Sequence, residues 1–305
     1  MSIRTDLALE AREMHGELEG VSEEKRNETG IEITRITVLN EEAAKKLEKA
    51  VGQYITIDAP ILEDRTSDAY ESLAKVISSE LTFLMGDISK TANILVVGLG
   101  NRFVTPDSLG PRVLDSIYVT RHIKEHIPEL SSPDMRPVCA VSPGVLGVTG
   151  VETFEIIKGL CDRIKPELVI AIDALASRRA ARISTTVQLS DAGISPGSGV
   201  GNMQKGLNFE SLGVKVIAIG VPLVVHASTI SQDTISLIAE ETGMHNDEEK
   251  LLGLAQKVID EHIGPLIVTP KEIDGIVSDM AKILANGINF ALFGEKTVEI
   301  GEMVM

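Results

Sequence analysis

The sequence predicts an α/β protein with a doubly wound, mostly parallel sheet and helices on both of its faces. Short apolar runs rich in β-branched residues, such as Ile94–Val97 and Glu167–Asp173, alternate along the chain with longer segments of helical periodicity. A run of this kind is typical of a strand that is buried on both faces of a parallel sheet. We therefore expect βαβ units, with a small N-terminal strand–helix–strand addition near residues 20–65.

In the N-terminal third of the chain, residues 1–19 are charged and show no strong period. Ile33–Leu39 alternates as a strand does, Asn40 is placed to cap a short helix, and residues 54–57 give a second short strand. Ser67–Leu84 carries its apolar residues on one helical face.

The rest of the chain continues the alternation. We expect helices over Leu109–His126, Gly150–Arg163, Thr229–Thr242, Asp247–His262 and Pro270–Asn289, strands over Pro137–Val141 and Val214–Val221 (ending at Pro222), an exposed or edge strand over Ile183–Leu189, and a short apolar run at Leu266–Val268.

Composition narrows the function classes. The 305 residues hold 29 Lys and Arg against 45 Asp and Glu, a net charge of −16, so a nucleic-acid-binding surface is not expected. Cys139 and Cys161 have no metal-type spacing and are expected to be buried, reduced thiols of an intracellular protein. No apolar run of membrane-spanning length and no signal-peptide core is expected, so we predict a cytoplasmic protein with no membrane partner.

Two aspartates follow buried strands and are the candidates for the chemistry. The strand Ile94–Val97 runs through Gly98 and Gly100 to Asp107, and the strand over residues 167–173 ends on Asp173. Since parallel strands deliver their carboxyl ends to one edge, these carboxyls are expected to face each other across a crevice. Two close carboxylates cannot both ionise cheaply, so one can act as acid while the other acts as base in peptide hydrolysis.

Two other interpretations of the pair stay open. Each aspartate alone is also a plausible helix cap. Alternatively, Asp107 and Asp173 bind a metal, with His226 as a third ligand.

Other motifs are weaker. Gly98–Phe103 begins like a dinucleotide-binding fingerprint, but the third glycine is replaced by Phe103. Gly193–Gly197 matches a nucleophile elbow, but Pro196 follows the serine and has no N–H for an oxyanion. The histidines show no zincin spacing, and we expect no cofactor and no dedicated metal site.

Several separate stretches resemble, in order, those of the spore germination proteases, a family of endopeptidases. They are RTDLA at residues 4–8, GLGN at 98–101, TPD at 105–107, PGV at 143–145, IDALA at 172–176, PGSGVGN at 196–202 and VTPKEID at 268–274.

The resemblance implies an enzyme, made in the developing spore as an inactive precursor, that degrades small acid-soluble spore proteins during germination. It implies a homotetramer in the spore core, with a fold similar to that of the hydrogenase maturation peptidases. The essential aspartates of the family match Asp107 and Asp173, and the self-cleavage position matches Asp6-Leu7. Residues 1–6 then form a short pro-segment and residues 7–305 a single peptidase domain.

A substrate cleft is also expected. Loops around Asn101, Gly144 and Gly199 are expected to shape it and to offer backbone N–H groups to the oxyanion, with His226 nearby where relatives carry an acid. A metal-dependent maturation peptidase and a non-enzymatic oligomeric binding module remain as alternatives.

Overall fold

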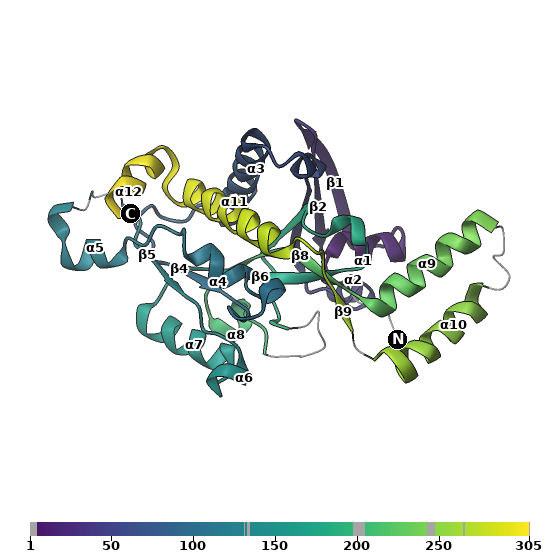
Figure 1. Cartoon of the computed structure of the whole chain (residues 1–305). Helices are drawn as coiled ribbons and strands as arrows, with labels where there is room; N and C mark the ends of the chain where they lie inside the picture. Colours follow the sequence, from purple (N-terminus) through teal and green to yellow (C-terminus); the bar gives the residue numbers. More distant parts are fainter. Residues whose placement is uncertain are drawn as a thin grey trace.

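A single mixed sheet organises the chain. The computed structural model describes residues 5–130, 132, 135–197, 205–242, 248–264 and 266–304. In this part of the chain nine strands pair in the order β1-β2-β3-β7-β8-β6-β4-β5, with β9 paired to β8 (Figure 1). The strands are β1 (Val21–Glu28), β2 (Ile31–Val38), β3 (Gly52–Asp58), β4 (Ile94–Gly98), β5 (Val138–Val141), β6 (Leu168–Ser177), β7 (Thr186–Ser190), β8 (Lys215–His226) and β9 (Ile267–Val268). The predicted α/β class with helices on both faces is confirmed.

The parallel part of the sheet consists of β8, β6, β4 and β5. All five residues of β4 are buried, as its continuous apolar run predicts. The prediction that the strand over residues 214–221 ends at Pro222 is wrong, because β8 continues to His226. The register between β6 and β8 shifts at Leu175/Ala176, next to the partner position Pro222, and such an irregularity accommodates a residue that has no N–H.

The strand β7 lies inside the sheet. It pairs antiparallel with β3 on one side and β8 on the other, and all five of its residues are buried. The prediction of an exposed or edge strand over residues 183–189 is therefore wrong. The N-terminal strands β1–β3 complete the same sheet on that side, so the alternating polar residues of β7 lie beneath the first helices rather than in solvent.

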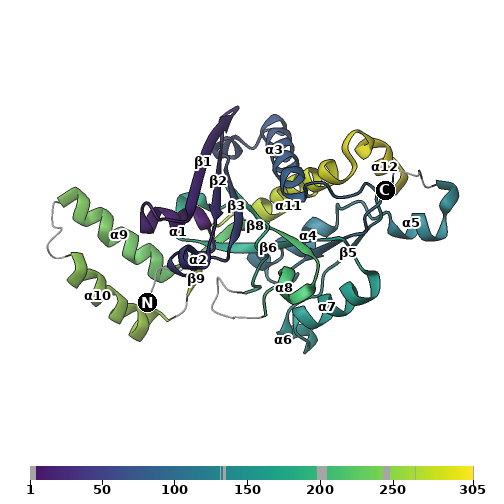
Figure 2. The ribbon, with the colours of Figure 1, turned by 180° about the vertical axis from the view of Figure 1, so that it is seen from behind.

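Helices cover both faces of the sheet. One face is covered by α3, α4 and α11, and the other by α7 and α8 next to the parallel strands and by α1 and α2 next to β1–β3 (Figures 1 and 2). The helices are α1 (Ala8–His15), α2 (Glu41–Leu47), α3 (Ser67–Met85), α4 (Leu109–Leu114), α5 (Arg121–His126), α6 (Leu146–Thr149), α7 (Thr153–Ile164), α8 (Phe209–Leu212), α9 (Ala227–Thr242), α10 (Glu248–Val258), α11 (Ile273–Phe293) and α12 (Thr297–Val304). As predicted, Asn40 caps α2, since its side chain accepts from the N–H of Ala43 at 2.9 Å.

One helix prediction needs correction, and a helix and a strand near the N-terminus were not predicted. The periodic segment over residues 109–126 is not one helix but α4 and α5, separated by a non-helical stretch that contains the β-branched residues Ile117, Val119 and Thr120. The N–H of Tyr118 in this stretch donates to Asn289 Oδ1 at 3.1 Å, so a side chain of α11 stabilises the non-helical stretch. The helix α1 and the charged strand β1 were not predicted.

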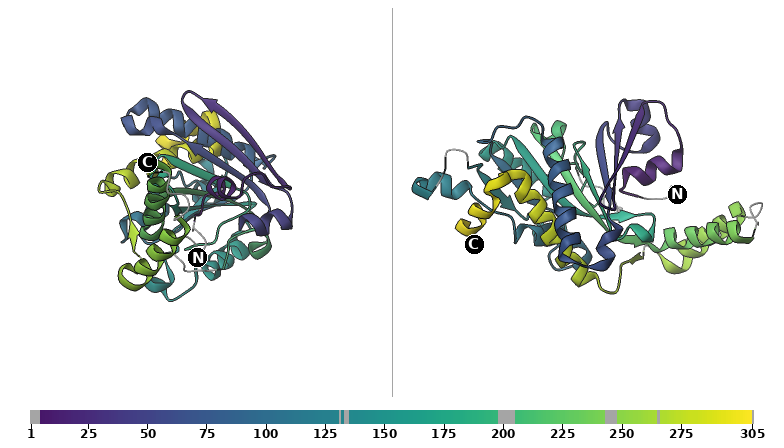
Figure 3. Two further views of the ribbon diagram at one scale, coloured as in Figure 1. Left: turned by 90° about the vertical axis from the view of Figure 1, so that its right-hand side faces the viewer. Right: turned by 90° about the horizontal axis from the view of Figure 1, so that it is seen from above.

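The C-terminal third contains an apolar helix and a projecting hairpin. The segment Ile273–Val304 is long and apolar enough to cross a membrane by length and composition, with a mean hydropathy of 1.3, whereas the sequence analysis expected no such run. Its apolarity is that of a core helix, because α11 packs against α3 and α4 over the sheet. The helices α9 and α10 form a hairpin that extends away from the sheet (Figure 3).

The crossing of α3 and α11 depends on Gly287. A Cβ at this position would lie 2.8 Å from Ile77 Cγ2 and 3.0 Å from the carbonyl oxygen of Ala74. We expect Gly287→Ala to lower the free energy of unfolding by about 1–3 kcal/mol through overpacking. Gly275→Ala in the same helix is the matched control, since a Cβ there meets nothing within 4 Å. Denaturant unfolding of both variants checks this, and equal stabilities would contradict the tight crossing.

Candidate active site

Asp107 is held at the end of β4 by a close loop. The chain leaves β4 through Gly100 at φ +101°, where a Cβ would lie 2.0 Å from the carbonyl oxygen of Asp107. The loop folds back so that the N–H of Asn101 donates to Asp107 Oδ2 at 2.8 Å. Burial raises the pKa of Asp107, and the hydrogen bond from Asn101 opposes that rise. Asp107 is thus a partly buried carboxyl with one backbone donor.

Asp173 lies on the adjacent strand β6. It follows Val169 and Ala171 on the sheet face covered by α7 and α8, and its side chain is buried. Its Oδ1 accepts from the N–H of Ala174 at 2.9 Å. Burial, and after it the charge of Asp107, raises the pKa of Asp173 well above the ordinary value.

The two carboxyls therefore interact, and their environments differ. Asp107 is less buried than Asp173, and the repulsion between them falls on the more buried group. We expect Asp107 to ionise before Asp173, because deeper burial and the charge of Asp107 raise the pKa of Asp173 further. Two acids with separated pKa values are the arrangement in which one carboxylate can accept a proton while its neighbour donates one.

The N-terminal segment runs into this region of the sheet. Asp6 pairs with Ala176 of β6: its N–H donates to the carbonyl oxygen of Ala176 at 3.0 Å, and its Oδ2 accepts from the N–H of Ala176 at 2.8 Å. The charge of Asp6 also contributes to the raised pKa of Asp173. The side chain of Leu7 is fully buried. The Asp6-Leu7 bond is thus held against β6, and the carboxylate of Asp6 lies close enough to Asp173 to affect its pKa.

Glu10 anchors the segment after this bond. Its carboxylate accepts from the N–H of Arg178 at 2.7 Å and from the N–H of Arg179 at 2.9 Å, and it also accepts from Thr5 Oγ1. Arg182 adds an ion pair at 3.8 Å. These contacts hold residues 5–10 at both ends. They could not be predicted from the sequence, because the segment shows no periodic pattern.

The other predicted site residues differ in position. Asn101 binds Asp107 through its backbone, and Gly144, at φ +74°, follows β5 at the same edge of the sheet. Gly199 lies outside the described residues. His226 is not brought to the pair: it follows the register partner of Asp173, Gly220, by six residues, or roughly 20 Å along a strand.

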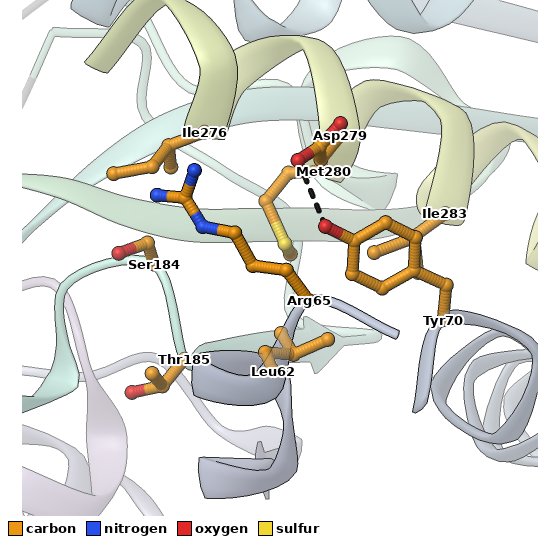
Figure 4. A pocket seen from close by; sticks show the side chains of 9 residues that line it. All are labelled: Leu62, Arg65, Tyr70, Ser184, Thr185, Ile276, Asp279, Met280 and Ile283. Atoms are coloured by element: carbon orange, nitrogen blue, oxygen red, sulfur yellow. Dashed lines mark hydrogen bonds between the residues drawn. The ribbon is translucent and has the colours of Figure 1, made fainter. Parts of the chain in front are cut away.

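Neither a clustered metal-ligand set nor the cavity between α3 and α11 adds to the site within the described residues. Within the described ranges no group of three or more His, Cys, Asp and Glu side chains could hold a metal ion. A cavity of about 280 Å³ lies on the opposite face of the sheet, between α3 and α11, where Tyr70 Oη donates to Asp279 Oδ2 at 2.8 Å (Figure 4). Its lining residues are Leu62, Arg65, Tyr70, Ser184, Thr185, Ile276, Asp279, Met280 and Ile283.

Comparison with known proteins identifies a family for the chain. The family model for germination proteases matches residues 2–252 and 242–303. The chain is 50% identical to the germination protease of Caldanaerobacter subterraneus subsp. tengcongensis, over 96% of this chain and 94% of that protein. It is 45% identical to the germination protease of Clostridium perfringens strain SM101 over 95% of both chains. It is 38% identical to that of Bacillus cereus strain ATCC 10987 over 95% of this chain and 94% of the relative.

The raised pKa of Asp173 predicts a pH-dependent stability. Between the two pKa values, Asp173 keeps its proton in the folded chain but has lost it in the unfolded chain. Its contribution to the free energy of unfolding is therefore complete below the ordinary carboxyl pKa of about 3.9. That contribution is lost as the pH rises through the raised pKa of the folded state. Asp173→Asn removes this loss. We expect its Tm, relative to the wild type, to be higher at pH 7 than at pH 4. Calorimetry checks this against the exposed control Asp115→Asn, and a Tm difference independent of pH would contradict it.

Proposed function

The chain belongs to the germination protease family and is an endopeptidase, and we propose that Asp107 and Asp173 together hydrolyse the peptide bond with water as the nucleophile. The observation that supports this most directly is the pair itself: two interacting carboxyls with unequal burial, beside a docked segment of polypeptide.

The roles follow from the order of ionisation. Asp107, ionised first, takes a proton from water as the water oxygen bonds to the carbonyl carbon. Asp173, still protonated, gives its proton to the amide nitrogen as the C–N bond breaks. The proton on Asp107 then returns to Asp173, which restores the starting pair. No covalent intermediate with the enzyme is required.

We propose that the chain is a precursor that cleaves itself between Asp6 and Leu7. The docked geometry supports this, since Asp6 is paired with β6 as a substrate strand would be and Leu7 is buried behind it. An extended segment that adds to strand residues in this way binds mainly through its backbone. While residues 5–10 occupy this place, another polypeptide cannot, so the precursor form is closed to substrate.

We propose that the substrates are small acid-soluble spore proteins in the core of the spore, cut after an acid and before an apolar residue. The contacts of the docked segment support this preference. The carboxylate of Asp6 is bound by β6, the side chain of Leu7 is buried, and the carboxylate of Glu10 has several donors.

We also propose that the chain assembles as a homotetramer. Apolar side chains of the α9–α10 hairpin stand exposed, among them Leu237 and Leu254 at 60% and 62%. A projecting hairpin with such side chains is typical of a surface that is covered in an assembly. Light scattering then gives four times the chain mass of 32.7 kDa.

The central test of the function is loss of self-cleavage in aspartate variants. Purified wild type, incubated at mildly acidic pH, is expected to acquire a new N-terminus at Leu7, read by sequencing and intact mass. Asp107→Asn and Asp173→Asn are each expected to lower the cleavage rate at least ~10³-fold, because both proton transfers need a carboxyl. Asp115→Asn is the matched control, since Asp115 is exposed and pairs only with Arg102 in the described structure.

The cleavage rates are compared only among variants that are folded. Circular dichroism and Tm establish that each variant is folded before its rate is compared. Cleavage at the wild-type rate by folded variants of both aspartates would end this proposal.

A further inference from the structure

Two side chains converge on the carbonyl oxygen of Asp6, the oxygen of the bond assigned to self-cleavage. Lys49 Nζ donates to it at 3.1 Å and Gln188 Nε2 at 3.2 Å. We propose that Lys49 and Gln188 are catalytic residues that stabilise the oxyanion formed at this carbonyl. The inference rests on the proposed function, because it takes the Asp6-Leu7 bond as the bond that is cut.

Gln188 holds the bond from both sides. Its Nε2 donates to the carbonyl oxygen of Asp6, and its Oε1 accepts from the N–H of Ala8 at 2.7 Å. Only this orientation of the amide satisfies both backbone groups, since a carbonyl needs a donor and an N–H needs an acceptor. The side chain therefore spans Leu7 and fixes the position of the bond that precedes it.

The sheet register places Gln188 opposite Asp173. Gly220 of β8 is the direct partner of Asp173 on one side and of Gln188 on the other, so the three residues form one row across β6, β8 and β7. Asp173 and Gln188 lie on the same face, with their backbones two strand spacings, about 10 Å, apart. The side chain of Leu175 packs over Gly220 between them, since its Cγ and Cδ1 lie 2.5 Å from where a Cβ of Gly220 would be.

Lys49 reaches the same oxygen from the end of α2. The helix ends at Glu48 in the left-handed conformation, and the N–H of Lys49 turns back to the carbonyl oxygen of Ala44 at 3.1 Å. Nζ of Lys49 then bridges the carbonyl oxygens of Thr5 and Asp6, at 3.0 and 3.1 Å. Burial lowers the pKa of Lys49, and the charges of Asp6 and Glu10 oppose that change. The donor is partly desolvated, where it stabilises a developing negative charge more strongly than in water.

In this arrangement the groups that stabilise the oxyanion differ from the groups that transfer protons. Of the loops predicted to supply oxyanion donors, the one around Asn101 uses the N–H of Asn101 to bind Asp107, and the N–H of Ala174 likewise binds Asp173. When water adds to the carbonyl carbon, the electron pair of the C=O bond moves to the oxygen, and Lys49 and Gln188 stabilise it by donation without transferring a proton. The proton of Asp173 stays available for the leaving nitrogen.

The first test compares self-cleavage rates of single variants. Lys49→Met and Gln188→Met keep the approximate size of each side chain and remove its donors. Each is expected to slow the appearance of the Leu7 N-terminus about 10²–10³-fold, the usual cost of one oxyanion donor. Lys46→Met on α2 is the matched control, since Lys46 is exposed, pairs with Glu42 and makes the same change of charge. It is expected to cleave at the wild-type rate.

The second test needs no activity. Asp6-Leu7 is the only Asp-Leu pair in the sequence, so labelling Asp at the carbonyl carbon with ¹³C and Leu with ¹⁵N gives a single correlated signal from this bond. In the non-cleaving Asp173→Asn protein, adding Lys49→Met or Gln188→Met is expected to move the Asp6 carbonyl resonance upfield, since a hydrogen bond to the oxygen is lost. Adding Lys46→Met is expected to leave the resonance in place.

The outcomes separate the two proposals. If the aspartate variants fail to cleave while Lys49→Met and Gln188→Met cleave within about threefold of Lys46→Met, well short of the cost of a donor, the oxyanion role is wrong and the proposed function stands. An unmoved carbonyl resonance also overturns the inference. If the wild type does not cleave itself, the proposed function fails, and a shifted resonance shows that the contacts exist without the reaction.

Discussion

A buried carboxyl group beside a second carboxyl has a raised pKa and keeps its proton, and the candidate active site depends on this property. Asp173 is buried on a central strand with one backbone donor, and the nearby charge of Asp107 opposes its ionisation. Apolar residues of β4 and β6 form the buried surroundings of Asp173 on this face of the sheet. An uncompensated buried acid is unfavourable for stability, and such groups gather where chemistry needs them.

The sheet also binds a segment of polypeptide in the region of the aspartates. The segment that carries Asp6 adds to the end of β6, α1 follows it onto the face beside α2, and the parallel strands present the aspartates to the same edge. One row of the sheet joins Asp173, Gly220 and Gln188, so an acid and an amide from two strands that do not pair with each other lie on the same face of the sheet. The sheet thereby holds the N-terminal segment of the chain through hydrogen bonds to the backbone of β6.

Part of this picture follows from the sequence and part does not. The aspartates could be predicted because buried strands have a recognisable pattern, as β4 and β6 show. The prediction that the second strand ends on Asp173 is wrong, since β6 continues to Ser177. The interior position of β7 could not be predicted, because whether a strand has one neighbour or two depends on the strands β1–β3 that pair beyond it. Lys49 and Gln188 carry no motif: one follows a helix end and the other alternates in a strand, and only the docked Asp6 gives them a common target. The continuation of β8 through Pro222 likewise depends on a register shift in its partner strand.

The proposed mechanism requires Asp107 and Asp173 to ionise at different pH, and a titration of both carboxyls tests this most directly. Following the side-chain ¹³C resonances of Asp107 and Asp173 with pH in the intact precursor, with Lys49 replaced to slow cleavage, gives both ionisations. The account predicts two separate steps, with Asp107 losing its proton first and Asp173 still protonated well above the ordinary carboxyl range. Two independent titrations near the ordinary pKa of about 3.9 would contradict it.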